Sequence, residues 1–314
     1  MPALLDKRLI FVTGKGGVGK STVATALGLV SARRGLRTIV VELGQQERVR
    51  RPFAPAPGPE PLPGRDREEV ELAPGRFTIS IDPQLAMEEY LRVKTGRLGN
   101  ALGSSKLFGA FAMATPGMRE LLSIGKIWEL AQLQRRTRGA DTYDLVVVDA
   151  PASGHGVGVL RTPTTFAEIA RVGPIAQQGR TIATTIADRT FTGFVVVATA
   201  EEMPVNETLA LRDALAEEQL ALDAVIVNAR YPERFQAAEL TPLREALAHV
   251  QSPLARAALR AALSEHARLT VQLGQQARLR ELMGTPLLEL PFVFADQLAR
   301  PALELLADSL EAQL

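Results

Sequence analysis

The chain has 314 residues, 46% of them hydrophobic and 23% charged, which is the composition of an ordinary globular protein with room for a sizeable core. Its 36 Lys and Arg residues nearly balance 35 Asp and Glu residues, so the net charge of +1 does not favour a nucleic-acid or anionic-membrane partner. The absence of cysteine excludes disulfides and thiolate sites for zinc or arsenite.

Two further features concern location and metals. No apolar run reaches the roughly 18 residues of a membrane span, and residues 1–10 pass into the first strand without the regions of a signal peptide. We therefore expect a cytoplasmic protein that does not insert directly into membranes. The three histidines, His155, His249 and His266, are too scattered for a metal cluster.

The first predicted strand, 9–12, leads directly into a glycine-rich segment, 14–22. Without Cβ atoms, glycines let backbone N–H groups turn toward phosphate oxygens. In this pattern Lys20 reaches the β- and γ-phosphates, Ser21 ligates Mg²⁺ and Thr22 adds an α-phosphate contact. A helix over 21–34 would place its positive N-terminus at the same point. The segment therefore predicts a site for ATP and Mg²⁺, whose loop residues are Gly14, Gly16, Gly17, Val18 and Gly19.

The next elements alternate in type. A strand is predicted over 38–42, followed by a stiff extended loop over 51–64, which holds six prolines, and then by a strand over 77–81.

Residues 84–138 predict a helical insertion with helices at 84–94, 98–113 and 116–135. The third helix is unusually apolar. Its apolar residues either pack the insertion itself or form a groove for a helical partner or hydrophobic protein client. A further helical stretch, 164–189, is expected to join this subdomain.

A strand over 143–149 ends in Asp149, the position of a Walker-B carboxylate that holds Mg²⁺ directly or through water. Gly154 and Gly156 follow, as expected of a mobile switch, with His155 between them either reporting the nucleotide state or packing. Further strands are predicted at 193–199, 224–228 and 286–290. Their continuous β-branched runs predict a single α/β domain over 1–314, a doubly wound and mostly parallel sheet.

Two motifs carry a family resemblance. Residues 14–22, Gly-Lys-Gly-Gly-Val-Gly-Lys-Ser-Thr, resemble the deviant P-loop (Walker A) of the SIMIBI ATPases. Residues 149–156, Asp-Ala-Pro-Ala-Ser-Gly-His-Gly, are similar to the second switch of the ArsA family, which includes the guided-entry ATPases that target tail-anchored proteins. The segments 81–83, 115–121 and 201–208 resemble that family's connecting segments in the same order.

The resemblance implies a dimeric ATPase, either a homodimer or a heterodimer with a paralogue, that couples nucleotide state to a client-binding helical subdomain. Lys15 is then the lysine that crosses to the partner's nucleotide, acting in catalysis with Lys20 and Asp149. Asn228 matches the residue that hydrogen-bonds adenine, and the loop at Pro291 and Phe292 flanks the base.

The sequence also departs from the family. By strand register, the first-switch aspartate that orients the attacking water is replaced at Gly44, which leaves Glu42, Glu47 or a neighbouring glutamine, Gln45 or Gln46, for that role. The chain is therefore either a hydrolase or an ATP-binding pseudoenzyme paired with an active paralogue. The missing cysteines remove the zinc clasp and the arsenite site. A ParA- or MinD-like positioning ATPase is a further alternative, which the acidic tail at 301–314 disfavours.

Overall fold

The structure is a computed structural model that describes residues 4–43, 48–53, 69–89, 116–135, 140–170, 173–295 and 297–314. Within these ranges one eight-stranded sheet has the order β3-β4-β2-β5-β1-β6-β7-β8. All neighbouring strands are parallel except β3 and β4. The strands are β1 (Leu9–Gly14), β2 (Thr38–Leu43), β3 (Val70–Ala73), β4 (Arg76–Ile81), β5 (Leu145–Asp149), β6 (Thr192–Thr199), β7 (Ala224–Arg230) and β8 (Leu287–Pro291).

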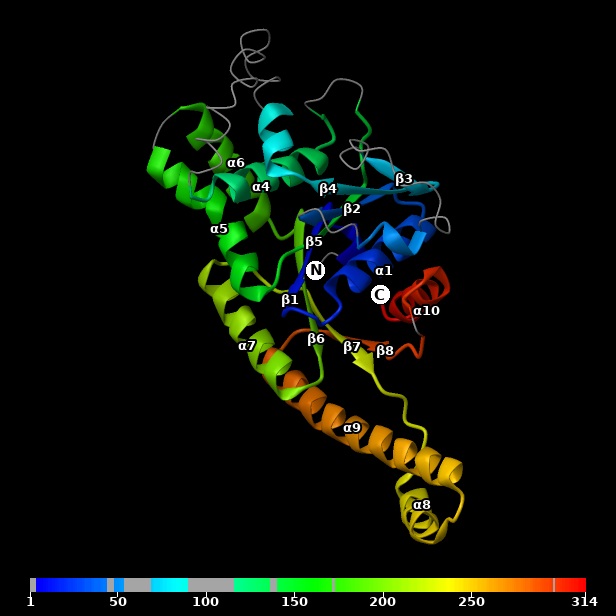
Figure 1. The fold of residues 1–314 in the computed structure, drawn as a ribbon. Coiled ribbons are helices and arrows are strands. Elements are labelled where there is room, and N and C mark those ends of the chain that lie inside the picture. Colours follow the sequence, from blue (N-terminus) through cyan, green and yellow to red (C-terminus); the bar gives the residue numbers. More distant parts are fainter. Residues whose placement is uncertain are drawn as a thin grey trace.

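Helices cover both faces of the sheet, as the apolar β-branched strands require. On one face α1 (Lys20–Arg33) packs beside α10 (Arg300–Glu311), and their aliphatic side chains form a single core with Ile10 and Val147 (Figure 1). On the other face lie α4 (Met118–Leu130), α5 (Ser153–Ala170), α6 (Pro174–Ala187) and α7 (Glu202–Glu217). The α/β, doubly wound architecture expected from the sequence is confirmed.

Part of the apolar surface of α4 belongs to the core on this face of the sheet. Ile124, Ile127 and Leu130 are buried against the sheet, and the Trp128 indole donates a hydrogen bond to Thr185 Oγ1 on α6 at 3.0 Å. Helix α4 also contacts α5, and α5 packs closely on α6. Packing is thus the role of these side chains, and Leu133, which is 69% exposed, lies just beyond the helix.

A helical arm leaves the opposite end of the sheet. Helix α9 (Pro253–Met283) has 31 residues, which at 1.5 Å per residue extends about 46 Å. Its C-terminal part packs Leu279 and Met283 against β7, while α8 (Ala237–His249) contacts its N-terminal part. Figure 1 shows α9 running away from the sheet with α8 at its far end.

Several boundaries differ from those expected. The stretch 164–189 is two helices, because α5 begins at Ser153 and a break before Pro174 separates it from α6. Helix α4 starts after Gly117, whose φ of +79° ends the preceding turn, and so is shorter than 116–135. The edge strand β3 was not anticipated. Residues 83–89 are helical as expected, whereas the predicted helix 98–113 lies outside the described residues.

Short 3-10 turns, η1 (Leu4–Asp6) and η2 (Arg51–Phe53), precede β1 and follow β2; the proline-rich loop beyond residue 53 lies outside the described residues. Across the described part of the chain, no helix is both long enough and apolar enough to cross a membrane.

Candidate functional site

The phosphate loop lies at the carboxyl end of β1, between β5 and β6, where parallel sheets of this type bind their ligands. The backbone has φ of +144° at Gly14, +85° at Gly17 and +93° at Gly19, a region that residues with Cβ rarely adopt. Gly14 also passes so close to β6 that a Cβ would lie 2.2 Å from the Val197 carbonyl oxygen. Sheet contact and backbone conformation therefore both require glycine.

Lys20 begins α1 directly after the glycines. Its Nζ donates a hydrogen bond to the Lys15 carbonyl at 2.9 Å, so the side chain folds back over the loop. Burial lowers the pKa of Lys20, Asp149 opposes that shift, and the positive charge of Arg48 adds to it. A polyphosphate at the loop would relieve the repulsion between the two cations.

Ser21 and Asp149 come together as the sequence predicts. The Ser21 hydroxyl donates to Asp149 Oδ2 at 2.5 Å, and the β1–β5 register pairs Asp149 with Val12, next to the loop. Burial raises the pKa of Asp149, while the Ser21 hydrogen bond and the Lys20 charge lower it. A hydroxyl and a carboxylate are oxygen ligands that suit Mg²⁺.

A metal at this point would draw its other ligands from phosphates and water, as Mg²⁺ in nucleotide sites does. Among the residues that the structure describes, no group of three or more His, Cys, Asp or Glu side chains is placed to hold a metal ion. The donor set therefore fits a nucleotide-bound Mg²⁺.

Lys15 projects from the loop toward α7. Its Nζ forms an ion pair with Glu207 Oε1 at 2.8 Å, and about a third of each side chain is exposed. The sequence did not reveal this partner, because Glu207 lies far along the chain. Because the pair is partly exposed, solvent weakens it.

Asn228 at the end of β7 contacts the loop directly. Its Nδ2 donates to the Val18 carbonyl at 2.9 Å, and a Cβ on Gly19 would meet the same nitrogen at 2.2 Å. Among the described residues, Oδ1 and the second amide hydrogen have no hydrogen-bond partner, which leaves them for a base edge. The side chain thus joins the end of β7 to the phosphate loop that follows β1.

The predicted base-flanking loop follows β8. Pro291 ends that strand, and the Phe292 ring stacks on Tyr231 with centroids 4.9 Å apart and planes inclined by 14°. Phe294 packs edge-on against Phe292. These rings form a half-exposed aromatic cluster beside the end of β7.

A cavity of about 360 Å³ opens beside the phosphate loop. The sequence predicted the part of its wall that belongs to the loop and α1, and missed the part that comes from after β2 and from the region of α10. Its lining residues are Gly17, Gly19, Lys20, Ser21, Thr22, Thr25, Arg48, Pro52, Leu298 and Leu303.

Glu42 is a buried carboxyl at the carboxyl end of β2. The β2–β5 register pairs it with Asp149, and burial raises its pKa to about 7 against the pull of hydrogen bonds from the backbone of Val49 and Arg48. Its Oε1 accepts from the Arg48 N–H at 2.8 Å. Among the candidates for the first-switch role, Glu42 therefore binds the backbone N–H groups of Arg48 and Val49. The other candidates, Glu47, Gln45 and Gln46, lie outside the described residues, as does Gly44.

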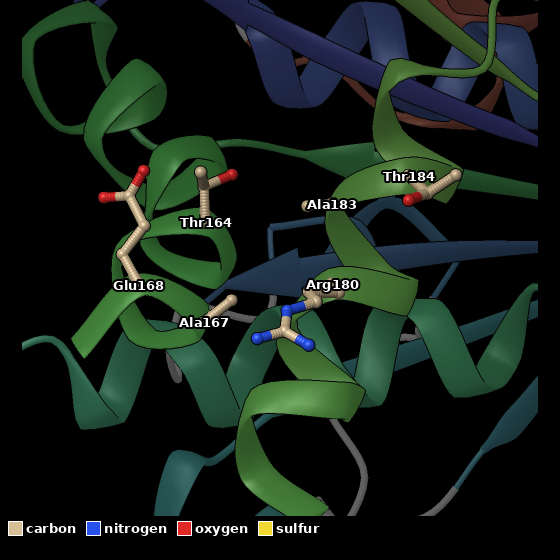
Figure 2. A pocket seen from close by; sticks show the side chains of 6 residues that line it. All are labelled: Thr164, Ala167, Glu168, Arg180, Ala183 and Thr184. Carbon is tan, nitrogen blue, oxygen red and sulfur yellow. The ribbon is translucent and has the colours of Figure 1, made fainter. Parts of the chain in front are cut away.

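The segment predicted to be a second switch is not a free loop throughout, since Ser153 to Gly156 form the first turn of α5. A separate groove of about 410 Å³ lies between α5 and α6. Figure 2 shows Thr164, Ala167 and Glu168 on α5 across the groove from the lining residues of α6. Small and charged residues line this groove, which does not suit an apolar helix.

Taken together, the loop geometry, the Lys20 and Ser21 positions and the carboxylate on the neighbouring strand define a P-loop nucleotide-binding protein. The family described as anion-transporting ATPase, ArsA_ATPase, matches residues 7–183 and 169–252 of this sequence. The chain belongs to this family of ATPases.

Individual relatives agree. ATPase BagA of Mycobacterium tuberculosis is 31% identical over 246 residues, covering 76% of this chain and 69% of the relative. ATPase GET3 of Komagataella phaffii is 24% identical over 254 residues, covering 70% and 72%. The arsenical pump-driving ATPase of Acidiphilium multivorum is 26% identical over 245 residues, covering 71% of this chain and 40% of that protein.

Proposed function

We propose that this protein binds Mg²⁺ and ATP at the phosphate loop and hydrolyses ATP as a nucleotide-dependent dimer. The observation that carries the proposal is the Ser21–Asp149 hydrogen bond of 2.5 Å beside the Lys20 amine. It brings the two predicted Mg²⁺ ligands together next to the phosphate-binding lysine, at the carboxyl edge of the sheet. The charges at the site support it, since an anion bound beside Lys20 and Arg48 would attract both cations and offset their mutual repulsion, as Asp149 already does for Lys20.

Each residue of the loop has a role in this scheme. The backbone from Gly14 to Gly19 holds the phosphates, Lys20 binds the β- and γ-phosphates and Thr22 contacts the α-phosphate. Ser21 and Asp149 hold Mg²⁺, Asp149 directly or through water, and bound Mg²⁺ would neutralise phosphate charge. Asn228 hydrogen-bonds the adenine with its free amide hydrogen and Oδ1.

The base would lie near the loop at Pro291 and Phe292. One face of the Phe292 ring is already stacked on Tyr231, which restricts a base to the rest of the ring surface. A base contact at Leu298, which lines the cavity with Thr22, is the alternative within the same loop.

Lys15 acts in trans in this proposal. It would exchange Glu207 for the phosphates bound by a partner subunit, either a second copy or a paralogue. A cation added at the transferred phosphoryl group typically contributes about 10³–10⁵ in rate. Closure of the dimer would couple the nucleotide state to the helical insertion predicted at 84–138, with or without 164–189, and through it to a hydrophobic protein client or helical partner; α4, α5 and α6 themselves pack on the sheet.

In this proposal the activity is cytoplasmic and involves neither nucleic acid nor direct membrane insertion; the net charge of +1 supports the absence of a nucleic-acid partner. Thiolate-bound zinc and arsenite have no part in it, because the chain has no cysteine.

The test is phosphate release from Mg·ATP by the wild type, Lys15→Ala and Lys20→Ala, with ATP affinity and molecular mass measured on the same samples. We expect Lys20→Ala to lose both ATP affinity and turnover. Lys15→Ala should keep ATP affinity, while its turnover falls at least a hundredfold, which corresponds to an activation barrier raised by about 3 kcal/mol.

The outcomes separate the two candidate functions. A wild type that binds ATP, dimerises and releases no phosphate would be the pseudoenzyme that Gly44 favours. A wild type that does not bind Mg·ATP would refute both.

A further inference from the structure

Arg48 stands at the wall of the nucleotide cavity, beyond the end of β2. It lines the cavity with Lys20, Ser21 and Thr22, and its charge acts on both Lys20 and Asp149. The side chain is exposed. Within the described part of the chain, no carboxylate lies within ion-pair distance of its guanidinium. The cation is thus close to the phosphate loop and forms no ion pair with a described carboxylate, although its charge acts on Asp149 and Glu42.

The backbone that carries Arg48 is anchored. Glu42 Oε1 accepts the Arg48 N–H at 2.8 Å, and a second hydrogen bond from the Val49 backbone reaches the same carboxyl group. Val49 itself is fully buried in the core that includes α1. Five residues beyond Arg48, Phe53 packs on that core under the Arg76 guanidinium, 4.0 Å from the ring centroid. The segment from Arg48 to Phe53 is therefore anchored to the core on the α1 face of the sheet, at Val49 and at Phe53.

Charge at the cavity explains what such a residue would bind. Lys20 and Arg48 are both positive, and the carboxyl group of Glu42 is occupied with backbone N–H groups. A planar guanidinium offers paired donors that match two phosphate oxygens. A polyphosphate on the loop would lie between the two cations.

We propose that Arg48 binds the polyphosphate of the nucleotide in cis, as a second cation beside Lys20, and that Glu42 positions it by holding its main chain. This inference rests on the proposed function of the same site and adds a residue to it. Lys15 would approach from the partner subunit, so the phosphates would be contacted from both subunits.

The first experiment measures dissociation constants of ATP, ADP and AMP by calorimetry, with Mg²⁺, at two salt concentrations. Arg48→Ala is expected to weaken ATP and ADP binding about ten- to a hundredfold and AMP binding less than about threefold. Arg48→Lys should restore part of the loss. Arg50→Ala, which removes the same charge two residues away, is the matched control and should bind ATP like the wild type.

The second experiment tests the positioning role. Glu42→Gln keeps an oxygen acceptor for the Arg48 N–H and should bind ATP nearly as the wild type does, whereas Glu42→Leu removes the acceptor and should weaken binding. In an Arg48→Ala background Glu42→Leu should have little further effect, because the two act through one contact.

Three results would overturn the inference: ATP binding by Arg48→Ala within twofold of the wild type, an equal loss in Arg50→Ala, or an undiminished effect of Glu42→Leu when Arg48 is already replaced. Thermal melting confirms folding of each variant. Because the Arg48 side chain is exposed, Arg48→Ala should fold, so the first experiment tests the inference even if Glu42→Leu does not fold. A wild type that fails to bind Mg·ATP would defeat the proposed function as well, which distinguishes the two failures.

Discussion

Replacing the glycines of the phosphate loop by alanine gives a graded test of the site's geometry. Gly16 has ordinary φ, and nothing lies within 4 Å of an added Cβ. Gly17 has the same open surroundings but a φ of +85°. Gly14 combines a φ of +144° with a Cβ position 2.2 Å from the Val197 carbonyl. The three variants therefore separate backbone strain from steric clash within one loop.

The magnitudes follow from these differences. Gly16→Ala should be neutral or stabilise by about 0.5 kcal/mol, because alanine restricts the unfolded chain. Gly17→Ala should cost about 1–2 kcal/mol for a left-handed conformation. Gly14→Ala should cost roughly 3–5 kcal/mol, since relieving the clash must separate β1 from β6 in the buried centre of the sheet.

The assay is urea unfolding without nucleotide at 25 °C, followed by far-UV circular dichroism and by fluorescence of the single tryptophan, Trp128 on α4. Coincident transitions would justify a two-state free energy. If Gly14→Ala cost no more than Gly17→Ala, the close approach of β1 and β6 would be wrong, and with it the placement of the loop.

Two further predictions concern ionisable groups. Burial raises the pKa of Glu42 to about 7 from 4.5, so the folded state binds its proton more tightly than the unfolded state. The charge of Asp149 adds to this pKa shift of Glu42 and the charge of Arg48 opposes it. Relative to Glu42→Gln, the Mg-free wild type should therefore lose up to about 3 kcal/mol of stability as pH rises from 4.5 to 8, as urea titrations at several pH values would reveal. A flat difference across that range would contradict the burial of the carboxyl. Glu207→Gln should change stability by less than about 1 kcal/mol, because the ion pair with Lys15 is partly exposed. The substitution frees Lys15 and should raise the fraction of dimer in Mg·ATP, measured by analytical ultracentrifugation. A lower fraction of dimer would argue against the exchange of Glu207 for a partner's phosphates.

Much of the phosphate site was predictable because its signals are local. The loop 14–22 is contiguous, and glycine, lysine and serine at this spacing have one common use between a strand and a helix. Asp149 was predictable because an apolar strand ends at it and parallel strands end at one edge. Their meeting at 2.5 Å needs only that β5 adjoins β1.

Helix boundaries were less predictable. Apolar periodicity persists through 164–189, yet Gly173 and Pro174 divide it into α5 and α6, and the first turn of α5 takes up residues that a Gly-rich sequence assigns to a loop. The apolar face of α4 had two interpretations with the same pattern. The structure buries Ile124, Ile127 and Leu130 of this face against the sheet, which periodicity alone does not encode.

The sequence by itself determined the nucleotide loop, the strand that carries Asp149 and the doubly wound class, since each depends on residues that are neighbours along the chain. Only the tertiary structure decided that Lys15 meets Glu207, that Asn228 holds the Val18 carbonyl and that Arg48 reaches the cavity wall. In each case the order of strands in the sheet brings together residues that are far apart in the sequence. That order results from packing across the whole chain, not from any local pattern.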